Sequence, residues 1–331
     1  MRRVLLALTV GLFVSPGCSH ATSLLSAEFV LTAQVSEASG FTGEATGAQR
    51  NALGLEWFGT AGGSRGDVLR FDIQARVSHD AGGPGDAGPG LELHNAWLEY
   101  RPSIGRSFRL GHFSPAFGLE PDVDTHGTLL QTQAGPDVGF KKDWGAAWTG
   151  IAGPGDLTLA LQTGSGAALD RRDRSYLATA RMTFPTGPNA TLGIATLVGR
   201  TLVAPDARTF PPPDVERDAV ERARGGIDLV REEGNTRVLA ELSAGTDDGE
   251  PQASVLARLE RSPLRLPRLR LAVQARFGRD RTRAASVVAL AADYRLTDRW
   301  TASASLSREA GTGGDDDLTL QLLLYYFGRV R

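Results

Sequence analysis

Hydrophobic and polar residues alternate along most of this chain. Within Val68–Ser78, the odd positions from Leu69 to Val77 are apolar and the even positions from Arg70 to Ser78 are polar. A period of two places successive side chains on opposite faces of a β-strand. The same pattern recurs in segments of about ten residues, the length of a transmembrane strand. The predicted strands are 26–36, 50–59, 67–79, 91–101, 106–113, 139–151, 155–163, 174–184, 190–200, 222–232, 235–245, 252–261, 266–278, 284–296, 298–308 and 317–327.

The connections between these strands alternate between short and long. The short turns lie at 101–106, 152–155, 185–189, 233–235, 262–267 and 297–298. The longer polar loops lie at 37–49, 80–90, 114–138, 164–173, 201–221, 246–251, 278–283 and 309–316. Bacterial outer-membrane barrels have an even number of antiparallel strands, short periplasmic turns and longer external loops. The pattern therefore predicts an all-β chain forming one closed antiparallel barrel of about 16 strands, whereas a β-sandwich gives no reason for such alternation.

The segment 91–138 organises the predicted barrel. Two strands form a hairpin that opens into about 25 residues rich in Pro, Gly, Asp and Thr. Loops of this length in compact domains are usually functional or disordered. We expect Phe113–Val138 to bend into the barrel and narrow its bore, with Phe117 and Leu119 as apolar anchors on the inner wall. A second charged segment, Phe210–Arg224, is interpreted as an external loop rather than as a helical linker.

The first residues resemble a secretory signal peptide. A positive amino terminus precedes an apolar run, Val4–Val14, that is too short to cross a bilayer as a helix. Ser19-His20-Ala21 resembles a small-x-small cleavage site. We expect residues 1–21 to be a signal peptide and residues 22–331 to form an outer-membrane β-barrel. The alternative is lipidation at Cys18, the single cysteine.

The composition agrees with a barrel and excludes several other classes. The chain contains 40 Gly and 41% hydrophobic residues, and its mean hydropathy is −0.17. No apolar run after the predicted signal peptide is long enough for a transmembrane helix. The formal net charge of −2 gives no indication of nucleic-acid binding.

Charged residues fall on the polar faces of the predicted strands. Arginine is costly on the lipid face near the middle of the membrane, so these side chains are expected to line the lumen. We predict that a basic inner wall faces an acidic loop at a pore constriction, where a transverse field biases the passage of ions. The alternative is that these charges pair with one another and fill the lumen. The predicted constriction residues are Glu120, Asp122 and Asp124 on the loop and Arg70, Arg76, Arg109, Arg258, Arg270 and Arg276 on the wall.

Signals for catalysis and metal binding are weak. No Gly-x-Ser-x-Gly motif is present, and the Gly-rich segments 58–63 and 164–166 do not open a helix after a buried strand. His112 and His126 flank the long loop near two aspartates, but their spacing matches no standard metal site. An enzyme barrel would require a nucleophile and a base brought together by the fold. We therefore expect no enzymatic activity, no metal and no cofactor.

Two consecutive strands resemble the phosphate-selective porin family. The residues are LHNAWLEYR over 93–101 and RLGHFSPAFGLE over 109–120. Their order, their spacing and the turn between them agree with the family's pattern. Ser114 and Ala116 stand where that family often has Lys and Pro, and no lysine ladder supports phosphate selectivity. The resemblance therefore implies a porin-like barrel rather than a phosphate channel.

Two functions from different classes follow from these patterns. The first is a porin, embedded in the lipid of the bacterial outer membrane, through which small polar or anionic solutes and ions diffuse passively. A homotrimer is an assembly compatible with this function. The second is a structural or conduit barrel that sheathes a periplasmic partner such as an electron-carrier protein.

Overall fold

The protein is described from a computed structural model of the 331-residue chain. The structure describes residues 20–43, 48–63, 66–79, 89–166, 173–202, 219–279, 284–311 and 316–330. Most of the expected signal peptide, including Cys18, and the loop residues Phe210–Pro213 lie outside these ranges. His20 and Ala21 belong to the first strand.

Seventeen strands and one short helix are present in the described ranges. The strands are β1 (His20–Ser36), β2 (Gly40–Thr42), β3 (Asn51–Gly63), β4 (Gly66–His79), β5 (Pro89–Ser103), β6 (Arg106–Phe113), β7 (Asp143–Ala152), β8 (Gly155–Gln162), β9 (Tyr176–Gly187), β10 (Ala190–Leu202), β11 (Ala219–Glu233), β12 (Thr236–Asp247), β13 (Glu250–Arg261), β14 (Leu269–Arg279), β15 (Ala284–Arg295), β16 (Trp300–Gly311) and β17 (Asp317–Arg329). The helix α1 (Ala134–Val138) lies in the connection between β6 and β7.

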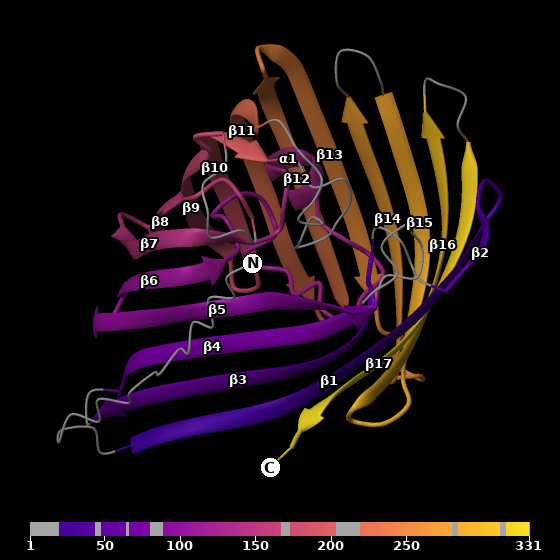
Figure 1. The fold of residues 1–331 in the computed structure, drawn as a ribbon, viewed down its shortest axis with the longest axis horizontal. Helices are drawn as coiled ribbons and strands as arrows, with labels where there is room; N and C mark the ends of the chain where they lie inside the picture. The colour runs from indigo at the N-terminus through magenta and orange to yellow at the C-terminus, as the bar shows by residue number, and fades with distance from the viewer. Residues whose placement is uncertain are drawn as a thin grey trace, which may run out of the picture.

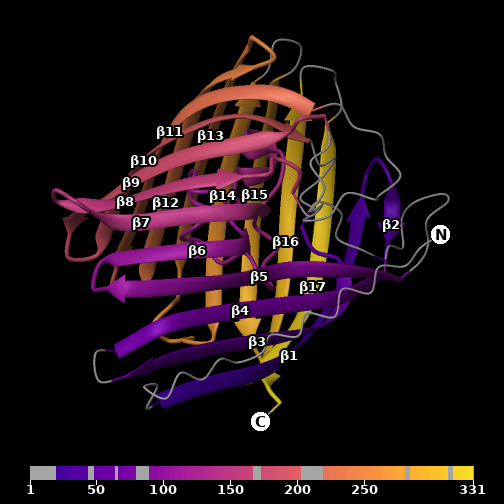
Figure 2. The same cartoon turned by 60° about the vertical axis from the view of Figure 1, so that its left-hand side comes forward.

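The long strands form one closed antiparallel ring. Neighbouring strands from β3 to β17 pair in chain order, and β1 pairs with both β3 and β17, where Phe29 lies opposite Tyr326. Figure 1 and Figure 2 show the indigo β1 beside the yellow β17 at this closure. The three residues of β2 pair with the end of β1. Without β2 the barrel has 16 strands, which confirms the fold predicted from the alternation.

Two connections differ from the sequence-based prediction. The expected longer loop at 246–251 is a two-residue turn, in which Asp248 and Gly249 have φ values of 49° and 81°. Positive φ at both central residues is the feature of type I′ turns, which match the twist of paired strands. The strand predicted at 222–232 also begins three residues earlier, at Ala219. Arg222 and Arg224, the end of the segment interpreted as an external loop, lie on this strand and form ion pairs in the lumen.

Alternate side chains on each strand face outwards. On β14, Leu271 and Val273 are 44% and 39% exposed, whereas Ala272 and Gln274 are buried. The pleat of a strand explains the alternation, and an apolar outer face is what contact with lipid acyl chains requires. The register therefore agrees with the predicted split between lipid-facing and lumen-facing residues.

An arginine at Val273 is expected to weaken folding into a bilayer. The side chain points outwards near the middle of β14, where a charge on the lipid face costs about 2–4 kcal/mol if the site is central. Equilibrium refolding of Val273→Arg into liposomes measures this cost. The matched control is Ser307→Arg on β16, because Ser307 shares the face of the buried Ser303 and Ser305. Equal losses in the two variants would contradict the register.

The connection between β6 and β7 lies inside the ring of strands, as Figure 1 shows for α1. Phe117 packs with Leu177 of β9 and Leu197 of β10, and Leu119 packs with Leu239 of β12. These contacts confirm the predicted inward course of the loop and its two apolar anchors. Within the described ranges, no helix is long and apolar enough to cross a membrane.

Candidate pore site

The inward loop is bound to the barrel wall through Asp137 of α1, whose side chain is fully buried. Its carboxylate accepts hydrogen bonds from Arg224 Nη1 at 2.9 Å, Ser254 Oγ at 2.8 Å and Ser243 Oγ at 2.9 Å. Arg222 donates to the Asp137 carbonyl at 3.2 Å. Buried carboxylates are tolerated when they are paired and hydrogen-bonded in this way. The helix is therefore held by three neighbouring strands, β11, β12 and β13.

Further contacts fix the rest of the loop across the lumen. Arg181 of β9 forms an ion pair with Asp122 at 2.5 Å and with Asp228 of β11 at 2.6 Å. Arg258 of β13 donates to the carbonyl of Gln131 at 3.0 Å. On the opposite side, Gln49 donates to the Thr125 carbonyl at 2.8 Å. The loop thus spans the bore and occupies much of it.

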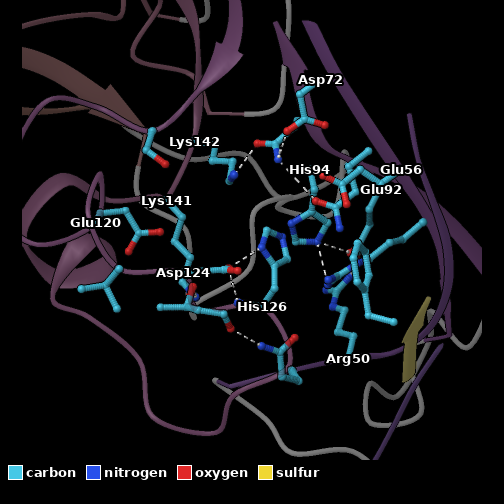
Figure 3. Close-up of a pocket in the computed structure, with 18 of the residues that line it drawn as sticks. Arg50, Glu56, Asp72, Glu92, His94, Glu120, Asp124, His126, Lys141 and Lys142 are labelled. Atoms are coloured by element: carbon cyan, nitrogen blue, oxygen red, sulfur yellow. Dashed lines mark hydrogen bonds and ion pairs between the residues drawn. The ribbon is translucent and has the colours of Figure 1, made fainter. Parts of the chain in front are cut away.

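A polar cavity of about 580 Å³ remains between the loop and the wall formed by β3, β4 and β5. Figure 3 shows the loop residues Glu120, Asp124 and His126 on one side and Glu56 and Glu92 on the other. The side chains of the segment after α1, Lys141 and Lys142, also line it. The lining residues are Ala48, Gln49, Arg50, Glu56, Asp72, Gln74, Arg76, Glu92, His94, Asn95, Ser114, Glu120, Pro121, Asp122, Val123, Asp124, Thr125, His126, Lys141, Lys142, Tyr325 and Phe327.

A β-bulge in β5 directs His94 into this cavity. Gln74 pairs with Asn95 and Ala75 pairs with Leu93, so the register between β4 and β5 shifts by one residue at His94. Bulges commonly redirect a side chain beside a functional site. As a result, both His94 and Asn95 line the cavity, although a regular strand would turn one of them outwards.

The two lysines are hydrogen-bonded to uncharged groups. Lys141 is buried and donates to Gln131 Oε1 and, at 3.3 Å, to Thr125 Oγ1. Lys142 donates to Asn95 Oδ1. Burial lowers the pKa of both lysines. Burial also raises the pKa of the Glu120 carboxyl, which accepts a hydrogen bond from Thr132. The negative charge of Glu120 opposes the lowering of the Lys141 pKa.

Two histidines join the loop to the wall. The rings of His94 and His126 lie 5.2 Å apart at 59°. Arg76 Nη1 lies 3.0 Å from His94 Nε2, and because a guanidinium only donates, this ring nitrogen is an unprotonated acceptor. His126 Nδ1 lies 2.7 Å from Asp124 Oδ1. Burial lowers the pKa of His126, while the hydrogen bond to Asp124 opposes that shift.

The docked position of the loop is expected to weaken in acid. Because the pKa of His126 is below its ordinary value of 6.5 in the docked loop, protonation favours the undocked loop. Neutral His126 stabilises the docked loop fully above pH 6.5. This stabilisation is lost as the pH falls below 6.5, because His126 then becomes cationic beside Arg76, Lys142 and His94. Channel current recorded between pH 8 and pH 4 should therefore change below pH 6.5. His126→Gln, which cannot titrate, should reduce this change; an identical profile would refute the assignment.

The predicted constriction residues do not all come together. Glu120, Asp122, Asp124 and Arg76 line the cavity of about 580 Å³. Arg258 and Arg270 line a smaller cavity on another side of the loop, together with Asp124. The remaining three arginines, Arg70, Arg109 and Arg276, line neither cavity.

The arginines also have different partners from those expected. Arg76 pairs with Glu28, Arg109 with Glu99 at 2.6 Å, and Arg270 with Asp293 at 2.8 Å. Carboxylates on the barrel strands, rather than loop carboxylates, therefore neutralise most of the predicted basic wall. Sequence alternation places a side chain in the lumen, but it does not identify which opposite charge lies within 4 Å.

Several site residues were not identified from the sequence. Lys141 and Lys142 fell inside a predicted strand, and Glu56, Asp72 and His94 were not selected because only arginines were considered on the wall. The polar residues at the even positions of 70–78 could have indicated that Asp72 faces the lumen together with Arg70 and Arg76. Nothing in the sequence marked the bulge that redirects His94. Within the described part of the chain, no group of three or more His, Cys, Asp or Glu is arranged to hold a metal ion.

Together, the closed ring, the inward loop and the polar cavity define the fold of an outer-membrane porin. The structure is similar to an anion-selective porin from Comamonas acidovorans, with a TM-score of 0.65 and 11% identity over 93% of this chain and 100% of that one. It is also similar to the trimer form of OmpT from Vibrio cholerae (TM-score 0.66, 9% identity, 93% and 99% coverage). A third similar structure is the outer membrane channel DcaP of Acinetobacter baumannii (TM-score 0.59, 13% identity, 93% and 97% coverage). No family model and no curated protein sequence matches the chain.

Proposed function

We propose that this protein is a porin of the bacterial outer membrane through which small polar solutes and ions diffuse passively, without catalysis or cofactor. The observation that carries the proposal is a polar cavity of about 580 Å³ between an inward loop and the wall of a closed barrel with an apolar outer face. Rings and patches of charge in such a bore determine which solutes pass. The fold it shares with solved porins supports the same function.

The alternative of a conduit barrel has less support. Its lumen would have to accommodate a partner protein, yet the chain's own loop crosses the bore and is bound to β9, β11, β12 and β13. The expectation of anionic solutes is also weakened, because it assumed a basic wall whose arginines are instead paired with carboxylates.

The test is electrical recording after reconstitution in a planar bilayer. The folded protein should produce discrete current steps in potassium chloride. Absence of current from protein whose barrel is shown to be folded by circular dichroism would refute the porin proposal. Assembly as a homotrimer is part of the proposal and is tested by native mass spectrometry in detergent.

A further inference from the structure

The cavity beside the loop has more acidic than basic side chains. Six carboxylates line it, namely Glu56, Asp72, Glu92, Glu120, Asp122 and Asp124. Four lysines and arginines line it, namely Arg50, Arg76, Lys141 and Lys142. The two histidines are counted as neutral at pH 7, because His94 accepts from Arg76 and burial lowers the pKa of His126. The lining therefore has two more acidic than basic side chains.

Ion pairs with residues behind the cavity do not remove this excess. Arg76 is paired with Glu28, and Asp122 is paired with Arg181. Counting these two partners adds one acid and one base, so the difference stays the same. Arg50 is paired with a lining residue, Glu92, at 2.6 Å. The two arginines of the lining are therefore each paired with a carboxylate, whereas Lys141 and Lys142 are hydrogen-bonded to uncharged groups.

Glu56 and Asp72 are two acidic side chains of this lining, and the charge of Lys142 acts on both. These residues are diagonal neighbours on β3 and β4, because Glu56 lies opposite Gln74 and Phe58 lies opposite Asp72. The ion pairs of the described residues include none to either carboxylate. Asp72 is 93% buried; its Oδ2 accepts from Asn95 Nδ2 at 2.9 Å, but its Oδ1 is buried without a hydrogen-bond partner among the described residues. Such a buried acceptor can take a hydrogen bond from water or from a solute in the cavity.

We propose that Glu56 and Asp72 form a selectivity site for small solutes that carry an ammonium group. The inference rests on the proposed porin function and reverses the anionic preference expected from the sequence. An ammonium offers three donors and a positive charge, which match two neighbouring carboxylates and the remaining Asp72 acceptor. An anionic solute instead meets an excess of like charge in a cavity with low-dielectric walls, which repels it.

The test uses a matched pair of four-carbon probes, 1,4-diaminobutane and succinate. In bilayers with a potassium chloride gradient, the reversal potential of the wild-type channel should show cation preference. Added diaminobutane should block the current, whereas succinate should not. The double variant Glu56→Gln/Asp72→Asn should bind diaminobutane about tenfold more weakly, since two charges near a dication are removed. The control Asp67→Asn/Asp156→Asn removes two exposed carboxylates that do not line the cavity and should bind as the wild type does.

The outcomes separate this inference from the porin proposal. A channel that conducts but prefers anions, or that succinate blocks better than diaminobutane, overturns the ammonium site and leaves the porin function standing. Equal block of the double variant and its control overturns the assignment to Glu56 and Asp72. Complete absence of current from folded protein overturns both. The cation preference of the wild-type channel and its block by the two probes are measured without any substitution. These measurements therefore still decide the proposal if a variant fails to fold.

Discussion

Replacing residues 118–132 with a short Gly/Ser linker should raise the single-channel conductance severalfold. This segment contains the loop residues that cross the bore between β9 and the β3–β5 wall, including Asp122 and Gln131 with their contacts to Arg181 and Arg258. Removing it joins the two cavities that the loop now separates. The barrel should persist, because its closure depends on β1, β3 and β17 rather than on the loop.

A control for the loop replacement keeps the length of the segment and removes its contacts. Replacing the same 15 positions with an equally long Gly/Ser sequence preserves the mass but lacks the apolar anchor Leu119 and the ion pair of Asp122. A flexible chain of this kind does not hold one position in the lumen, so its current should fluctuate between levels. If both variants conduct like the wild type, the loop does not limit the bore.

Asp137→Ala should release the loop from the wall. The substitution leaves the buried Arg224 with one carboxylate partner, Asp247 at 2.8 Å, in place of two. It also removes the acceptor shared by Ser243 and Ser254, whose hydroxyls keep only the hydrogen bond to each other at 2.9 Å. Breaking a buried ion pair by removing one partner typically costs about 3–5 kcal/mol. Most of this cost is expected to fall on docking of the loop, because Asp137 is the loop's most buried charge.

Limited proteolysis measures this release. Trypsin cleaves after lysine, and Lys141 is only 8% exposed while the loop is docked. The Asp137→Ala variant should therefore be cut at Lys141 or Lys142 much faster than the wild type at pH 8. Asp124→Asn is the matched control, because the Asp124 side chain is 77% exposed and exposed ion pairs contribute little. Equal cleavage rates in both variants would show that Asp137 does not hold the loop.

Much of the architecture could be predicted from the sequence because it depends on local periodicity. The alternation at 68–78 identifies a strand and its two faces, and the alternating connection lengths identify the barrel. Phe117 and Leu119 were recognisable as anchors because apolar residues in a polar loop need a surface to pack on. The turn at Asp248–Gly249 was mistaken for a loop, since polar residues are common to both and only the backbone angles distinguish them.

The partners of the charged residues could not be predicted. Arg76 and Arg109 were correctly assigned to the lumen, but their partners Glu28 and Glu99 lie on neighbouring barrel strands rather than on the loop. An ion pair forms only within about 4 Å, and such distances depend on the tilt and stagger of strands that close the ring. The position of a charged residue in the sequence therefore does not show which opposite charge will lie within that distance once the ring has closed.

The sequence by itself determined that this chain forms a closed barrel of about 16 strands with an apolar exterior and an inward loop. A strand's period of two and the length of its connections are local properties, so they can be read without the fold. Only the tertiary structure decided that the loop is bound through Asp137 to β11, β12 and β13, and that a bulge turns His94 into the cavity. It also decided that the cavity has more acidic than basic lining residues and that Glu56 and Asp72 lie on neighbouring strands there, because the lining of a bore depends on which side chains meet across it.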